Sequence, residues 1–178
     1  QAGRFNQGAN QWPETLPSFR DTMTEYFNVM NSLGARIMEA LALSLNLKPG
    51  FFEEFCHQPL STLRLLHYPP QPANPAPGEK GCGAHTDFGG VTVLLLDDNP
   101  GLQVWDARSE RWIEANPIPG TFVVNLGDMI ARWTNDRYRS TLHRVVNSSG
   151  KERFSVPFFF SGNLDHTVTC LPTCLSEG

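Results

Sequence analysis

The sequence has no excess of basic residues, no long apolar run and few cysteines. Its 178 residues include 14 Lys and Arg against 18 Asp and Glu, a net charge of -4, so we expect no nucleic-acid partner, because phosphate backbones attract basic surfaces. No run has membrane-spanning length and no segment resembles a secretory signal, so we expect no membrane partner. The four cysteines show no zinc or redox spacing. We therefore expect reduced thiols and a cytoplasmic location, with disulfide bonds as the alternative.

Turn-forming residues, by contrast, are frequent. The 14 prolines and 15 glycines, with 40% hydrophobic residues, favour a β-rich domain over a helical bundle, and the length suits one domain. Apolar residues at steps of three and four predict a helix over residues 16–47, packed against a sheet. From residue 60 the period changes to two, which predicts a sandwich or jelly roll. The predicted strands are residues 61–68, 91–96, 102–105, 111–115, 121–126, 141–146 and 153–160.

The stretch "GAHTDFGGVTVLLL" places His85 and Asp87 immediately before one of these strands. Two residues apart on extended backbone, the two side chains project to the same side. His143, which interrupts an apolar strand, is the best candidate for a third ligand. Two histidines and one carboxylate form the facial triad that holds non-haem ferrous iron and leaves positions open. Structural zinc sites are instead usually closed cages rich in cysteine.

The strand "RFSVPFFF" carries a second pair with matching spacing, Arg153 and Ser155. A guanidinium and a hydroxyl that point the same way from one strand suit a carboxylate, since paired N–H bonds fix its charge and its plane. Tyr68, at the end of strand 61–68, is a candidate third donor. A dicarboxylic keto-acid fits this arrangement, with its keto-acid end on the metal and its far carboxylate on Arg153.

Four segments carry a resemblance to a known family: "LRLLHYPP", "HTDFGGVTVLL", "NLGDMIARWTNDRYRSTLHRVV" and "RFSVPFFF". They resemble the isopenicillin N synthase-like family of 2-oxoglutarate and iron(II)-dependent oxygenases, and the similarity spans almost the whole chain. The resemblance implies His85, Asp87 and His143 as iron ligands. It implies Arg153 and Ser155 as the 2-oxoglutarate carboxylate site, with Tyr68 assisting. Many relatives have asparagine where this sequence has Leu66, so support for Tyr68 is weaker.

The same resemblance implies a reaction and a fold. It implies a double-stranded β-helix, a jelly-roll or cupin-like core, packed by the long N-terminal helix. With iron(II), 2-oxoglutarate and dioxygen, such a protein couples oxidative decarboxylation of 2-oxoglutarate to hydroxylation, desaturation or cyclisation of a small organic molecule. Because Asp87 occupies the carboxylate position, halogenation is disfavoured. We expect substrate-pocket walls from apolar side chains close to the triad, namely Leu66, Phe88, Phe158 and Phe160.

The resemblance also predicts how the chain is divided. Residues 1–58 would form an irregular segment and a helical support region, residues 59–163 the dioxygenase core, and residues 164–178 a C-terminal tail. Since relatives are longer and the chain starts at Gln1, we expect a natural N-terminal region to precede it. Three other functions stay open: an iron oxidase of isopenicillin N synthase type that does not use 2-oxoglutarate, a zinc hydrolase, and a non-catalytic jelly-roll module. The sequence predicts no oligomeric state.

Overall fold

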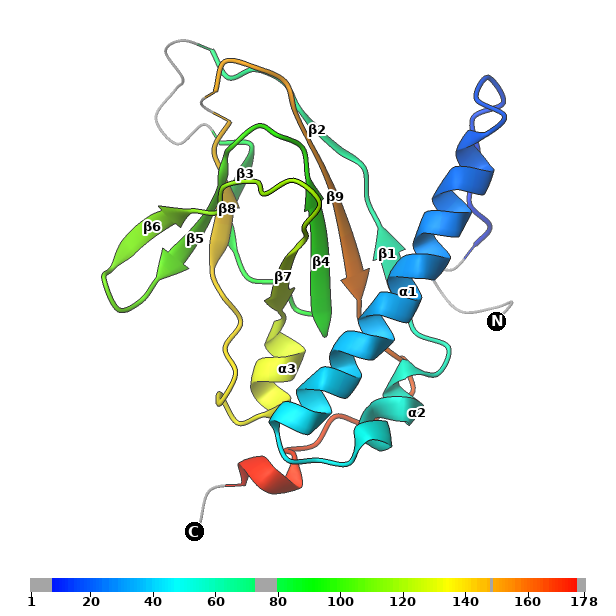
Figure 1. The fold of residues 1–178 in the computed structure, drawn as a ribbon, viewed down its shortest axis with the longest axis vertical. Coiled ribbons are helices and arrows are strands. Elements are labelled where there is room, and N and C mark those ends of the chain that lie inside the picture. Colours follow the sequence, from blue (N-terminus) through cyan, green and yellow to red (C-terminus); the bar gives the residue numbers. More distant parts are fainter. Residues whose placement is uncertain (1–7, 73–79, 148, 176–178) are drawn as a thin grey trace.

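Two antiparallel β-sheets form the centre of the molecule (Figure 1). The structure is a computed structural model, which describes residues 8–72, 80–147 and 149–175. Much of the predicted proline-rich loop, residues 73–79, lies outside them. The mainly β architecture with a long N-terminal helix, predicted from the change of period near residue 60, is confirmed.

The larger sheet is built around its longest strand, β9 (Arg153–Phe160). Strand β9 pairs on one side with β4, which in turn pairs with β7, and on the other side with β1 and β2 in succession. The partners are β1 (Ser61–Leu63), β2 (Leu66–Tyr68), β4 (Val91–Leu96) and β7 (Val123–Leu126). The smaller sheet has the order β3-β8-β5-β6. Its strands are β3 (Cys82–His85), β5 (Leu102–Asp106), β6 (Arg111–Glu114) and β8 (His143–Val145).

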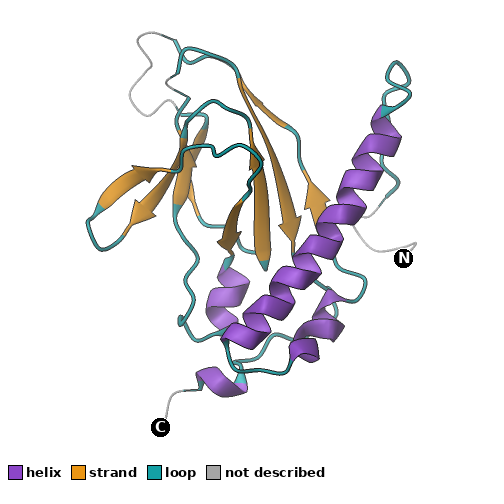
Figure 2. Cartoon of the chain, viewed as in Figure 1, coloured by secondary structure: helices purple, strands orange, loops and turns teal. Residues whose placement is uncertain are grey.

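The long helix α1 (Phe19–Ser44) covers the outer face of the larger sheet. Its buried residues recur every fourth position, as Met30, Gly34, Met38 and Ala42, which is the spacing of one helix face. Figure 2 shows the remaining helices grouped beyond one end of the sheets. They are η1 (Pro49–Phe52), α2 (Glu53–Cys56), α3 (Asp128–Trp133) and η2 (Pro172–Cys174).

Strand β9 separates the hydrophobic core from the interior between the sheets. Phe158 and Phe160 are buried in the core beneath α1, where the Phe158 ring meets Phe27 edge-on at 5.6 Å. The alternate residues of β9 face the other way and line a pocket between the two sheets: Arg153, Ser155, Pro157 and Phe159. The period-two geometry of one strand therefore supports both the core and the candidate site.

The structure differs from the sequence-based expectation at several elements. The strand predicted over 61–68 is two strands, interrupted at Arg64 and Leu65, although both parts pair with β9. Strand β3 and the short helix α3 were not predicted. Among the residues that the structure describes, no helix combines the length and the apolar character needed to cross a bilayer.

Candidate metal and co-substrate site

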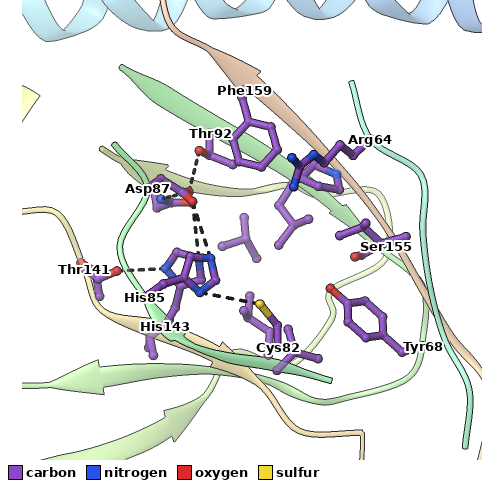
Figure 3. A pocket seen from close by; sticks show the side chains of 18 of the residues that line it. Arg64, Tyr68, Cys82, His85, Asp87, Thr92, Thr141, His143, Ser155 and Phe159 are labelled. Atoms are coloured by element: carbon purple, nitrogen blue, oxygen red, sulfur yellow. Dashed lines mark hydrogen bonds and ion pairs between the residues drawn. The ribbon is translucent and has the colours of Figure 1, made fainter. Parts of the chain in front are cut away.

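Three side chains of the predicted triad meet between the sheets (Figure 3). One ligand atom from each of His85, Asp87 and His143 lies within 4.8 Å of the others. The Asp87 Oδ1 atom is 3.8 Å from His85 Nε2 and also 3.8 Å from His143 Nε2. The two histidines face each other across adjacent strands, because His85 on β3 is the register partner of His143 on β8. The structure thus brings together the residues that the spacing had singled out.

Backbone carbonyls orient both imidazoles. His85 Nδ1 lies 2.8 Å from the carbonyl oxygen of Gly83, and His143 Nδ1 lies 3.0 Å from that of Thr141. A carbonyl can only accept a hydrogen bond, so each Nδ1 carries the proton in the neutral ring. Each Nε2 lone pair is then left to face the other two ligand atoms, which is the orientation that metal-binding histidines require.

Two side chains of the larger sheet orient the carboxylate. Asp87 is buried, and its Oδ2 atom accepts hydrogen bonds from Thr92 Oγ1 at 2.7 Å and from Asn125 Nδ2 at 2.8 Å. These bonds occupy one oxygen and direct Oδ1 to the histidines. Thr92 lies on β4 and Asn125 on β7, where the two are register partners. The position of the carboxylate is therefore set by the sheet.

The backbone of Asp87 is held equally closely. Its carbonyl accepts the Asp128 N–H at 2.7 Å, and the neighbouring Gly127 N–H bonds to the Gly90 carbonyl at 2.8 Å. A Cβ atom on Gly127 would lie 2.8 Å from the Asp87 carbonyl oxygen and closer still to the Gly89 carbonyl oxygen. Because only glycine lets the two backbones approach this closely, Gly127 fixes the loop that carries the carboxylate.

At the β2 side of the pocket, Arg153 is buried with unpaired nitrogens. Its side chain is 1% exposed, and its Nε and Nη1 atoms have no hydrogen-bond partner among the described residues. The guanidinium lies 5.1 Å from the Tyr68 ring centre, a cation–π distance. Ser155 lies on the same face of β9, and register pairs Tyr68 with Arg153 and Leu66 with Ser155. A buried guanidinium with free N–H groups is well suited to a carboxylate ligand.

The expected apolar walls need correction. Leu66 lines the pocket as predicted. Phe158 and Phe160 do not line it, because their side of β9 faces α1, and Phe88 is 85% exposed on the loop after Asp87. From β9, the pocket is lined instead by Phe159 and Pro157. Strand alternation places Phe158 and Phe160 on one face of β9, but it does not specify whether that face points inward.

The pocket is also lined by residues that the sequence analysis does not assign to the site, among them Arg64, Cys82, Thr92 and Asn125. Thr92 and Asn125 did leave a signal, since each is a polar residue inside an otherwise apolar strand. The Cys82 sulfur lies 3.7 Å from His85 Nδ1. Burial first, and the Asp87 carboxylate second, raise the pKa of the Cys82 thiol, while Arg64 lowers it. The Cys82 sulfur lies beside His85 Nδ1, while Nε2 is the ring atom that faces Asp87, so Cys82 is a neighbour of the triad.

The donor set fits ferrous iron. Two imidazole nitrogens and one carboxylate oxygen on one side of a pocket leave the opposite side open to further ligands, as in the facial triads of non-haem iron proteins. Ligand bonds of about 2.0–2.2 Å require donor atoms about 3 Å apart, so the three donor atoms, two pairs of which are 3.8 Å apart and all of which lie within 4.8 Å, must close up when an ion binds. Among residues 8–72, 80–147 and 149–175, this is the one group of three such side chains close enough to hold an ion.

Comparisons with known proteins agree with this geometry. The profile of the 2OG-Fe(II) oxygenase superfamily matches residues 59–162. A 2-oxoglutarate-Fe(II) type oxidoreductase of Emericella nidulans is 48% identical over 180 positions, covering 99% of this chain and 52% of that protein. Another, from Aspergillus fumigatus, is 42% identical over 178 positions, covering 98% of the chain and 53% of that protein. The chain thus spans about half the length of these curated relatives.

A solved structure shows the same arrangement of the chain. A full-length Neurospora crassa protein, solved in complex with alpha-KG, superposes with a TM-score of 0.91 at 33% sequence identity. The match covers 97% of this chain and 56% of that one. The jelly-roll core predicted from the strand pattern is therefore the core of a structurally characterised protein.

Proposed function

Since this chain belongs to the 2OG-Fe(II) oxygenase superfamily, we propose that it is an iron(II)- and 2-oxoglutarate-dependent oxygenase that acts on a small organic molecule. In this reaction 2-oxoglutarate and dioxygen give succinate and carbon dioxide, and one oxygen atom is left to oxidise the substrate. Hydroxylation is the simplest outcome, with desaturation or cyclisation as variants. The observation that carries the proposal is the Asp87 oxygen 3.8 Å from both imidazoles, in one pocket with the unpaired nitrogens of Arg153.

Each site residue has a defined task in this proposal. His85, Asp87 and His143 would hold the iron, which together with 2-oxoglutarate supplies the activation of dioxygen. Arg153 binds the far carboxylate of 2-oxoglutarate through its free N–H groups, and Ser155 donates a further hydrogen bond. Tyr68 contributes a ring against the guanidinium.

The pocket walls complete the proposal. The apolar side chains of Leu66, Leu94, Val123 and Phe159 line the pocket, and they would keep bulk water from the reacting centre. We assign residues 59–163 as the oxygenase core, residues 1–58 as an irregular segment and a helical support, and residues 164–178 as a tail.

The substrate class and the location belong to the proposal too. Among structural neighbours, the same Neurospora crassa protein has been solved with thymine and with 5-formyluracil, and a rice protein is a dioxygenase for auxin oxidation. These small ligands support a small-molecule substrate here. All four cysteines are unpaired, which supports a cytoplasmic location, where thiols stay reduced.

Succinate release tests the function directly. The protein, loaded anaerobically with ferrous iron, should release succinate from 2-oxoglutarate once air is admitted, and a chelator should stop the release. Asp87→Ala should lower the rate at least about 100-fold, since loss of a neighbour of a ligand already costs about 10- to 100-fold. Arg153→Met should raise the KM for 2-oxoglutarate. The matched control is Asp21→Ala, which removes an exposed carboxylate on α1.

Other outcomes would redirect the assignment. Oxygen uptake without succinate would support the iron oxidase that does not use 2-oxoglutarate. A preference for zinc with hydrolysis of ester or amide probes would support a hydrolase. Asp87→Ala with unchanged succinate release would contradict the site altogether.

A further inference from the structure

Arg64 is a second arginine in the pocket, and the proposed reaction does not use it. It lies at the break between β1 and β2, is exposed, and lines the pocket together with the triad. Its guanidinium lies 5.7 Å from the centre of the Phe159 ring. Figure 3 shows its side chain beside Phe159, on the opposite side of the pocket from Cys82. Within the described part of the chain, no carboxylate forms an ion pair with it.

The position of Arg64 separates it from the co-substrate end. Its backbone N–H donates to the Pro157 carbonyl at 3.0 Å, whereas Tyr68 is opposite Arg153. The backbone of Arg64 thus lies opposite Pro157, four residues along β9 from Arg153. Four residues correspond to about 13 Å of strand. The carboxylates of a five-carbon diacid are only about 6 Å apart. Because this length is well below the backbone spacing, we assign 2-oxoglutarate to Arg153 and leave Arg64 for another ligand.

The Arg64 guanidinium nevertheless lies near the strands that position the metal ligands. The Phe159 ring beneath its guanidinium is the register partner of Thr92, and Thr92 donates the 2.7 Å hydrogen bond to Asp87. A ligand that met Arg64 would therefore have its remaining atoms close to the reacting centre. The surfaces available to those atoms are apolar: Phe159, Pro157, Leu94 and Val123.

The sum of the charges in the pocket indicates the kind of ligand that Arg64 binds. Among the described residues that line the pocket, Asp87 is the one acid, and Arg64 and Arg153 are the two permanent cations. With ferrous iron and dianionic 2-oxoglutarate in place, the charges of the ion, the co-substrate, Asp87 and Arg153 cancel. The positive charge of Arg64 is then left over at an exposed position beside largely apolar walls, where it attracts a single negative charge.

We propose that Arg64 is the substrate-binding cation and that the substrate is a small carboxylic acid with an apolar body. This inference rests on the proposed function and specifies its substrate class. A carboxylate matches the single charge and the planar fork of the guanidinium. A phosphate ester, with nearly two charges, would leave one uncompensated beside the apolar walls. Arg64 sets specificity, and the chemistry remains with the metal centre.

Binding to matched acid and amide pairs tests the proposal. The probes are phenylacetate, indole-3-acetate, cinnamate and hexanoate, each against its primary amide, with thymine as a neutral planar probe. Each is titrated by calorimetry into the protein that holds ferrous iron and 2-oxoglutarate without oxygen. At least one acid should bind on the order of 10-fold more tightly than its amide, as expected for a charged hydrogen bond. In Arg64→Gln this ratio should fall to about one.

Two further variants make the result specific. Arg64→Lys should retain part of the acid preference, because it keeps the charge but not the fork. Arg20→Gln removes an exposed arginine of α1 outside the pocket and should leave the preference intact. Cooperative thermal unfolding of all three variants confirms that they are folded.

Several results would overturn the inference: equal affinity for acids and amides, no binding of any acid, tighter binding of thymine than of every acid, or an acid preference that survives Arg64→Gln. Succinate release, measured separately, keeps the two proposals apart. Succinate release without Arg64-dependent binding would remove the substrate class alone. Arg64-dependent binding without succinate release would remove the oxygenase assignment and retain the ligand class.

Discussion

At the scale of single residues, the candidate metal site depends on side chains that would not contact the ion themselves. Asp87 offers one oxygen to the histidines only because Thr92 and Asn125 hold the other. A carboxylate that rotated freely would lose this alignment and the geometric selectivity that follows from it. Thr92 is 5% exposed, so no solvent molecule replaces its hydroxyl easily when it is removed.

Thr92→Val tests this positioning. The variant keeps the shape of the side chain and removes the donor to Asp87, so we expect the affinity for Mn²⁺, used as a redox-stable substitute for Fe²⁺, to fall about 10- to 100-fold. Calorimetry measures the change. Thr134→Val is the matched control, because Thr134 is equally buried and its hydroxyl donates to the Ile130 carbonyl, away from the triad. Equal losses in both variants would show that stability, and not carboxylate orientation, had changed.

At the scale of elements, the packing of α1 on β9 depends on one small residue. Gly34 faces the sheet, and a Cβ atom there would lie 2.6 Å from the Cδ2 atom of Phe160, whose ring is itself 1% exposed. A buried ring has little room to move. The absence of a side chain at position 34 therefore allows the helix to approach the strand that carries Arg153.

Gly34→Ala should destabilise the fold despite the better helix propensity of alanine. Overpacking costs about 1–3 kcal/mol and the propensity gain returns up to about 1 kcal/mol, so we expect the free energy of unfolding in urea to fall by roughly 1–2 kcal/mol. Adding Phe160→Leu should recover part of the loss caused by the clash. Ser32→Ala, at an exposed position of α1, should change stability by less than about 0.5 kcal/mol. A more stable Gly34→Ala variant would contradict this account of the packing.

Some secondary-structure elements can be predicted from the sequence and others cannot. Strands β4 and β9 lie at the predicted positions, 91–96 and 153–160, because long β-rich runs between turn residues are unambiguous. Helix α3 was missed because its six residues are too few to show a helical period. The inward face of β9 could not be predicted, since both of its faces are largely buried.

The same limits apply to the site. The spacing of His85 and Asp87 predicted a shared direction, and the structure brings His143 to them. The hydrogen bonds from Thr92 and Asn125 depend on strands that are distant in sequence, and no local pattern specifies which strands become neighbours. The sequence does not identify Arg64 as a site residue, because its proposed role depends on the charge balance of the assembled pocket.

At the scale of the whole molecule, the triad joins the two sheets. His85 and His143 belong to the smaller sheet, through β3 and β8. Asp87 is bonded to Thr92 on β4 and Asn125 on β7 in the larger one. An ion held by all three side chains would therefore link the sheets directly. Metal binding should contribute to global stability as well as to the reaction.

Thermal unfolding with and without metal tests this link. Mn²⁺ at about 100 times its dissociation constant should add about 2.7 kcal/mol, which for a domain of this size raises the Tm by roughly 5–10 °C. A chelator should return the Tm to the metal-free value. His143→Ala should abolish the shift, because the remaining two ligands lie on one short segment and no longer connect β8 to the larger sheet. If His143→Ala showed the full shift, the ion would be bound at some other place, and the proposed link between the sheets would be wrong.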